Sequence, residues 1–191
     1  MKFKWAIGAV LLMIALLSIG CGGGSGTPKP EKEDSIQGMW YSTKKDKSSG
    51  VISSISLLEI KDSKSAHLTK WDLKGNTFSG SNGKYTKILW QSTDLDLAIS
   101  KSGNKLEFTV PDVKEMGTVL ECEYNSDKQT LKSKDGDSVF SSKEIPVQKL
   151  KEENIKAYQE FAAKQGVTVE LEKDMTSGEY LEYVKKNSFE N

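Results

Sequence analysis

Hydrophobic and polar residues alternate along most of the chain between residues 35 and 148, and this pattern limits the fold more than any other feature. In the segment 93–99, Leu95, Leu97 and Ile99 fall on one face and two aspartates on the other. Successive side chains of a β-strand point to opposite faces, so the pattern predicts a strand with one buried face. The segment 120–124 alternates in the same way and places Cys122 on its buried face.

Short turn sequences separate the alternating segments. They contain the residues that accept the positive φ angles of tight hairpin turns, namely Gly75-Asn76, Asn82-Gly83, Gly103-Asn104, Asn125-Ser126-Asp127 and Asp135-Gly136. Seven or eight short strands joined in this way predict an antiparallel meander. Because open sheet edges promote association, we expect the meander to close. The predicted fold class is mainly β, an antiparallel up-and-down barrel over residues 35–150.

A helical pattern replaces the alternation in residues 151–191. The apolar residues of the first predicted helix share one face, and Gly166 follows as its C-terminal stop. Residues 167–171 alternate again and predict a short extended segment. Thr176 and Glu179, three residues apart, form a capping box that predicts the start of a second helix.

The first 21 residues carry a targeting pattern. Two lysines precede an uncharged apolar run over residues 5–19, which is shorter than the roughly 20 residues that a helix needs to cross a bilayer. Gly20 and Cys21 follow this run. The segment resembles the signal and lipobox of bacterial lipoproteins, with Ser18 where that family usually has leucine.

The lipobox resemblance implies that residues 1–20 are a signal peptide and that Cys21 carries acyl chains, palmitate among them, that anchor the protein. Residues 21–34 then comprise the lipidated cysteine and a flexible linker rich in glycine, serine and proline. We expect a protein of the cell envelope that faces away from the cytoplasm. In a two-membrane host we expect the outer membrane, because Gly22 stands where a retention signal has aspartate. The alternatives are a plain secretory signal and a buried apolar helix.

A Gly-x-Trp motif opens the β region at Gly38 and Trp40. The motif, followed by a meander and a helix, resembles the lipocalin pattern, especially the small lipocalin-like lipoproteins of bacteria, over residues 35–172. The resemblance implies that the glycine lets the chain turn across the closed end of a barrel. It also implies that the tryptophan plugs that end against a cation, here Lys143 or Lys149. The alternative is an ordinary core tryptophan in another β-barrel or sandwich.

Composition and missing motifs exclude several function classes. The chain has 27 lysines and 27 acidic residues, and removing residues 1–20 leaves a net charge of −2, which argues against a nucleic-acid partner. His67 is the only histidine, and no Cys-x-x-Cys or calcium-loop motif is present. Cys122 has no disulfide partner if Cys21 is lipidated. We therefore expect no enzyme, no cofactor and no metal site.

The aromatic residues of the meander would either line an apolar cavity or fill the barrel. The first hypothesis is a non-catalytic protein that binds a small apolar or amphipathic ligand in the barrel. Its predicted lining residues are Trp71, Leu95, Leu97, Phe108 and His67. The second hypothesis is an interaction module of the cell envelope with a filled barrel and a protein partner.

Two observations would separate these hypotheses. A cavity of several hundred Å³ would favour ligand binding, because small-molecule sites fall in the range of about 300–1,000 Å³. An uncovered apolar face at Tyr180, Leu181 and Val184 would favour a protein partner.

Overall fold

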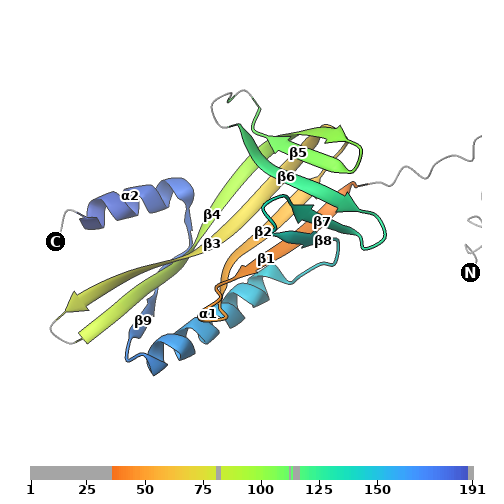
Figure 1. The fold of residues 1–191 in the computed structure, drawn as a ribbon. Coiled ribbons are helices and arrows are strands. Elements are labelled where there is room, and N and C mark those ends of the chain that lie inside the picture. The colour runs from red at the N-terminus through yellow and green to blue at the C-terminus, as the bar shows by residue number, and fades with distance from the viewer. Residues whose placement is uncertain (1–35, 81–82, 112, 114–116, 189–191) are drawn as a thin grey trace, which may run out of the picture. The chain divides into compact units, whose positions relative to one another are not determined.

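The computed structural model describes residues 36–80, 83–111, 113 and 117–188, and Figure 1 shows its fold. The predicted signal, Cys21 and the linker lie outside these residues. The first eight strands are β1 (Gly38–Lys45), β2 (Ile52–Ile60), β3 (Ser65–Gly80), β4 (Gly83–Ser102), β5 (Lys105–Thr109), β6 (Thr118–Asn125), β7 (Thr130–Ser133) and β8 (Val139–Ser141). They are followed by α1 (Val147–Lys164), β9 (Thr168–Leu171), β10 (Met175–Thr176) and α2 (Ser177–Ser188).

The strands β1 to β8 form a closed barrel. Each pairs antiparallel with its neighbours in sequence, and β8 returns to β1 through the pair Tyr41 and Ser141. The structure therefore confirms the predicted antiparallel up-and-down barrel, and the architecture fits a lipocalin-like fold. Gly103 and Gly136, with φ angles of 62° and 74°, occupy two of the predicted turns.

One predicted turn is wrong. Gly75 lies within β3, opposite Ile88 of β4, and the hairpin continues to the pair Gly80 and Gly83. A Cβ atom at Gly75 would lie 3.4 Å from a methyl group of Thr86 and 3.6 Å from the hydroxyl of Tyr158 in α1. These are ordinary van der Waals distances, so neither the space at Gly75 nor its φ angle requires a glycine there.

Helix α1 packs on the outside of the sheet, where it covers β2 and the long β3–β4 hairpin (Figure 1). The cluster beneath it comprises Ile52, Ile55, Trp71, Leu73, Trp90, Ile145, Val147, Leu150 and Ile155. The buried amide of Asn154 accepts a hydrogen bond from the Ile52 N–H at 2.6 Å and donates one to the Ile52 carbonyl at 2.7 Å. Lys151 lies over the ring of Trp90, 5.9 Å from its centroid, and pairs with Asp174. The helix is thus held by packing and by polar contacts.

The C-terminal elements extend the sheet outside the barrel. β9 and β10 both pair in parallel with β4, at residues 85–88 and 91–92. The predicted capping box is confirmed, because Glu179 accepts from the Thr176 N–H at 2.7 Å while Thr176 accepts from the Glu179 N–H at 3.3 Å. Helix α1 begins at Val147, before residue 151, directly after Pro146 with its φ of −75°.

Contacts group residues 34–191 in one unit, and both hydrophobic clusters found among the described residues lie within it. This unit contains its own core and can therefore fold without the preceding residues. Among the described residues, neither helix is both long and apolar enough to cross a membrane.

Candidate functional site

The interior of the barrel changes from apolar to polar along its strands. The register places Trp40, Leu58, Leu68 and Leu95 in one layer across β1 to β4. The next layer contains Ser42, Ser56, Lys70 and Thr93, and the one beyond it contains Lys44, Ser54 and Asp72. On each of these strands, the interior therefore changes from apolar to polar within a step of two residues.

The polar layers surround a cavity of about 670 Å³ that opens to solvent. Its polar lining comes from β1, β2, β3, β4 and the β7–β8 region: Lys44, Ser53, Ser54, Ser56, Lys70, Asp72, Lys74, Thr93, Asp135, Asp137 and Ser138. Its apolar lining comprises Leu68, Leu73, Leu95, Val119, Leu120 and Phe140. We call this space the open-end cavity. Its volume falls within the range of about 300–1,000 Å³ that is usual for small-molecule sites.

Two ion pairs lie in the lining of the open-end cavity. Lys44 of β1 meets Asp137 of the β7–β8 turn at 2.5 Å, and Lys70 meets Asp72 within β3 at 3.0 Å. The Asp137 carboxylate raises the pKa of Lys44 above its ordinary value. A hydrogen bond from Ser133 lowers the pKa of Asp135, so this carboxylate is charged at neutral pH. The cavity therefore presents fixed charges of both signs.

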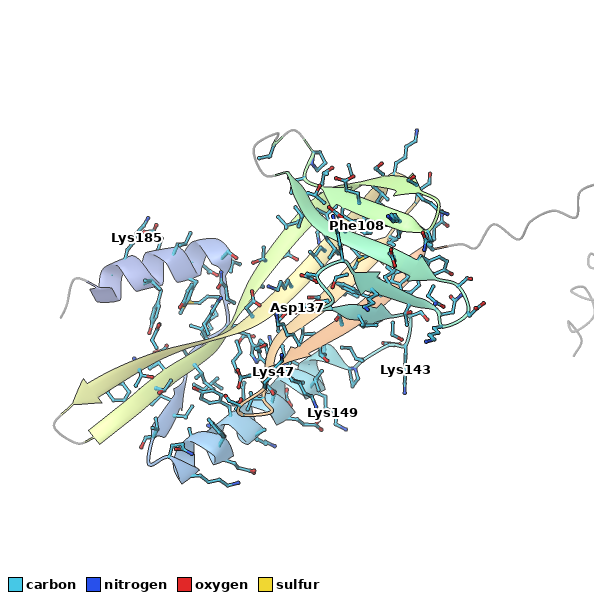
Figure 2. All side chains as sticks on the ribbon, viewed as in Figure 1. Lys47, Phe108, Asp137, Lys143, Lys149 and Lys185 are labelled. Carbon is cyan, nitrogen blue, oxygen red and sulfur yellow. The ribbon has the colours of Figure 1, made fainter. Side chains whose placement is uncertain are left out.

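The other half of the interior is packed shut. Its side chains are almost fully buried and comprise Ile36, Trp40, Leu58, Ile60, Ala66, Leu97, Leu106, Phe108, Cys122, Tyr124 and Leu131. Phe108 and Asp137 are labelled in Figure 2, one from this packed half and one from the open-end cavity. A ligand of the cavity therefore meets a floor of side chains and does not pass through the barrel.

Trp40 lies within the packed half, as the Gly-x-Trp motif implies. Its indole N–H donates to the Ile36 carbonyl at 2.8 Å, and its ring meets Tyr124 edge-on at a centroid distance of 5.9 Å. No stacking of Lys143 or Lys149 on this ring is found in the described structure. Gly38 has a φ of 130°, a conformation that L side chains rarely adopt.

The five predicted lining residues do not come together. Leu95 lines the open-end cavity, whereas Leu97 and Phe108 are buried in the packed half. Trp71 lies outside the barrel, in the cluster under α1, because the outer face of β3 is covered by that helix. His67 shares the outer face of β3 with Trp71, opposite Glu59 and Asp96.

His67 takes part in a polar cluster on the outer surface. Its Nδ1 lies 2.8 Å from a carboxylate oxygen of Asp96, and its Nε2 lies 3.6 Å from Asp94, which also accepts a hydrogen bond from Thr69. The hydrogen bond from His67 lowers the pKa of Asp96. Within the described residues, no group of three or more His, Cys, Asp and Glu side chains is arranged to hold a metal ion.

Cys122 is 2% exposed, and burial raises the pKa of its thiol to about 12. Because the thiolate is the reactive form, this cysteine is a core residue and not a nucleophile at neutral pH.

Sequence reasoning missed the charged lining residues, although a signal for them was present. Lys70 and Asp72 have the same strand phase as Ala66 and Leu68, whose side chains are buried in the barrel. The period of two requires an inward position for both, although neither was among the predicted lining residues. A change from apolar to polar within one phase of a strand therefore indicates a cavity.

Comparisons of the chain with protein-family models, with curated proteins and with solved structures find no match. The functional interpretation accordingly depends on the residues and geometry described above.

Proposed function

We propose that this protein is a membrane-anchored, non-catalytic lipoprotein that binds a small amphipathic ligand in the open-end cavity. The observation that carries the proposal is the layered interior, in which a charged rim surrounds a short apolar floor. An amphipathic molecule matches this order, because its polar head can contact the charged rim while its apolar body contacts the floor. Burial of the apolar body contributes about 25 cal/mol per Å² removed from water.

The absence of catalysis is part of the proposal. The only histidine of the sequence lies on the outer surface with Asp94 and Asp96, away from the open-end cavity. Neither histidine nor cysteine is among the described residues that line the cavity. The lining therefore offers no histidine as a general base and no cysteine as a nucleophile.

Anchoring through Cys21 is supported by the lipobox pattern alone. We expect Cys21→Ser to abolish incorporation of labelled palmitate and to move the protein from the membrane fraction to the soluble fraction. Cys122→Ser is the matched control, because it changes the other cysteine and leaves the lipobox intact. Unchanged labelling of the Cys21 variant would reject the anchor.

Ligand binding can be tested with residues 34–191, purified from the native host and analysed by native mass spectrometry. We expect a co-purifying molecule of low mass that is lost on denaturation. Tryptophan fluorescence is a poor reporter, because none of the described residues that line the cavity is tryptophan. The test therefore uses a substitution that fills the cavity with a bulky side chain.

Ser56→Trp places a large ring in the open-end cavity, whereas Thr43→Trp adds the same ring at an exposed position of β1. We expect the first variant to lose the bound molecule and the second to keep it. Retention of the molecule by both variants, each shown to unfold cooperatively, would place its binding site elsewhere and contradict the proposal.

The second candidate function is a protein-interaction module of the cell envelope. The observation in its favour is a groove between α1 and the outer barrel wall, lined in part by Tyr41, Leu57, Trp71 and Val147. The C-terminal helix gives it less support, because Tyr180 and Val184 are half-buried and only Leu181, at 60%, is strongly exposed. A photo-reactive residue at Leu57 that crosslinks to one envelope protein in cells, while one at Ser100 does not, would favour this function.

A further inference from the structure

We propose that the ligand of the open-end cavity is electrically neutral overall and carries a zwitterionic head group. This inference rests on the proposed function and adds to it the charge class of the ligand. It comes from the placement of the charges around the cavity.

Cations and carboxylates balance in the cavity lining. The cations are Lys44, Lys70 and Lys74, and the carboxylates are Asp72, Asp135 and Asp137. The lining therefore has no net charge to attract a simple anion, such as a fatty acid, or a simple cation. A ligand with both signs of charge matches it best.

The ion pairs favour a ligand that carries both signs of charge. In the structure Lys44 is paired with Asp137, and Lys70 with Asp72. A singly charged head that binds one partner of a pair leaves the other partner without its counter-ion. A zwitterionic head can pair with both partners at once, so neither the lysine nor the aspartate is left without a counter-ion.

The pairs are also open to exchange. The side chains of Lys70 and Asp72 are 43% and 24% exposed, and those of Lys44 and Asp137 are more exposed still. Exposed ion pairs are weak and screened by salt, so a ligand can separate them at low cost. Ser54, Ser56 and Thr93 lie next to these charges and supply hydroxyl groups for the uncharged part of the head.

The apolar part of the ligand must be short. Leu68, Leu95, Leu120 and Phe140 belong to the apolar lining. Beneath the lining, Leu58, Leu97 and Phe108 are each no more than 2% exposed. A long acyl chain would have to displace this core. The structure therefore favours a chain that ends at the level of Leu68 and Leu95.

The test compares four probes that share an eight-carbon chain and differ only in the head. These are octylphosphocholine, octyl sulfate, octyltrimethylammonium and octyl glucoside, which are zwitterionic, anionic, cationic and uncharged. Affinities for residues 34–191 are measured by isothermal titration calorimetry below the concentrations at which the probes form micelles. We expect the zwitterion to bind at least about fivefold more tightly than each of the others, and its advantage to shrink in 1 M salt.

Charge variants report on the two signs separately. Lys70→Met removes a cation from the lining and should shift the preference toward octyltrimethylammonium, whereas Asp72→Asn should shift it toward octyl sulfate. Lys134→Met is the matched control, because Lys134 pairs with Glu121 at 2.6 Å and is not among the cavity-lining residues. We expect this variant to keep the preference of the original protein.

The outcomes separate this inference from the proposed function. Binding that Ser56→Trp abolishes, but with equal or tighter affinity for an anionic, cationic or uncharged head, would overturn the zwitterion inference and leave ligand binding in place. No binding of any probe, combined with no molecule in the native mass spectrum, would overturn both.

Discussion

The two halves of the barrel interior share strands β1 to β4 and yet differ in packing and polarity. In the packed half, Trp40, Leu58 and Phe108 exclude water almost completely. In the open half, strands β1, β2 and β3 present Lys44, Ser56 and Asp72 to the open-end cavity. The comparison teaches that closure of a barrel and filling of a barrel are separate properties of its sequence.

The packed half supplies the stability that the open half does not. Dense packing of apolar side chains gives most of the free energy of folding, whereas serine and paired charges near solvent contribute little. One half can therefore carry polar residues suited to binding because the other half holds the strands together. The predictions below test this division of roles.

The largest effect is expected in the packed half. Phe108→Ala removes a fully buried ring and should lower the free energy of unfolding by about 3–5 kcal/mol. Ser56→Ala, in the open half, should change it by less than about 0.5 kcal/mol. Urea unfolding followed by circular dichroism measures both. Similar losses for the two variants would show that the halves are not energetically distinct.

A second large effect is expected at the rim of the open half, where α1 supports β2 from outside. Asn154→Leu removes both hydrogen bonds to the backbone of Ile52 and leaves its N–H and carbonyl buried without those partners. The free energy of unfolding should fall by about 2–6 kcal/mol, because each of the two unsatisfied buried groups costs about 1–3 kcal/mol.

The control for Asn154 is Gln148→Leu on the same helix, whose side chain bonds only to exposed Glu152. We expect little change from it. Hydrogen exchange should also accelerate at Ile52 in the Asn154 variant and not at Leu58. Unchanged exchange at Ile52 would mean that α1 does not support the rim.

Burial of Cys122 in the packed half should make the free energy of unfolding depend on pH in the alkaline range. Its thiol pKa is raised from an ordinary 9.0 to about 12. Above pH 9 the unfolded chain loses this proton while the folded chain keeps it, so stability falls as the pH rises toward 12. The slope is up to about 1.4 kcal/mol per pH unit for a single group.

Cys122→Ala should remove the part of the stability loss above pH 9 that comes from the thiol. Subtracting the stability curve of the variant from that of the original protein isolates this part, because lysine and tyrosine titrate in both. Stability below pH 9 should differ only by the packing change. Parallel stability curves from pH 8 to pH 11 would contradict the raised pKa of the buried thiol.

The barrel could be predicted from the sequence because the relevant information is local. Alternation around Leu95, Leu97 and Ile99 defines a strand with one apolar face, and turn residues such as Gly103 define where the next strand begins. The capping box at Thr176 and Glu179 is equally local, and the structure contains it. Features that depend on a few neighbouring residues could thus be predicted from the sequence.

The lining of the site was less accessible because it depends on contacts between distant segments. Alternation places Trp71 and His67 on one face of β3, but only the position of α1 shows that this is the outer face. Likewise, burial of Phe108 and exposure of Lys70 depend on how closely opposite walls of the barrel approach. The alternation of residues along a single strand does not reveal the distance between opposite walls of the barrel.

The smallest effect is expected for the ion pair between Lys44 and Asp137, which lies in the open half and in solvent. The pair raises the lysine pKa, so its stabilising effect is present below the ordinary pKa of 10.5 and is lost as the pH rises through the raised value. A double-mutant cycle of Lys44→Met and Asp137→Asn should give a coupling that disappears in 1 M salt. The same cycle should alter ligand affinity more than it alters the urea midpoint, because these residues line the cavity and do not hold the core. If these substitutions lower stability strongly and leave binding unaffected, the ion pair stabilises the fold. The open half would then contribute to stability as the packed half does.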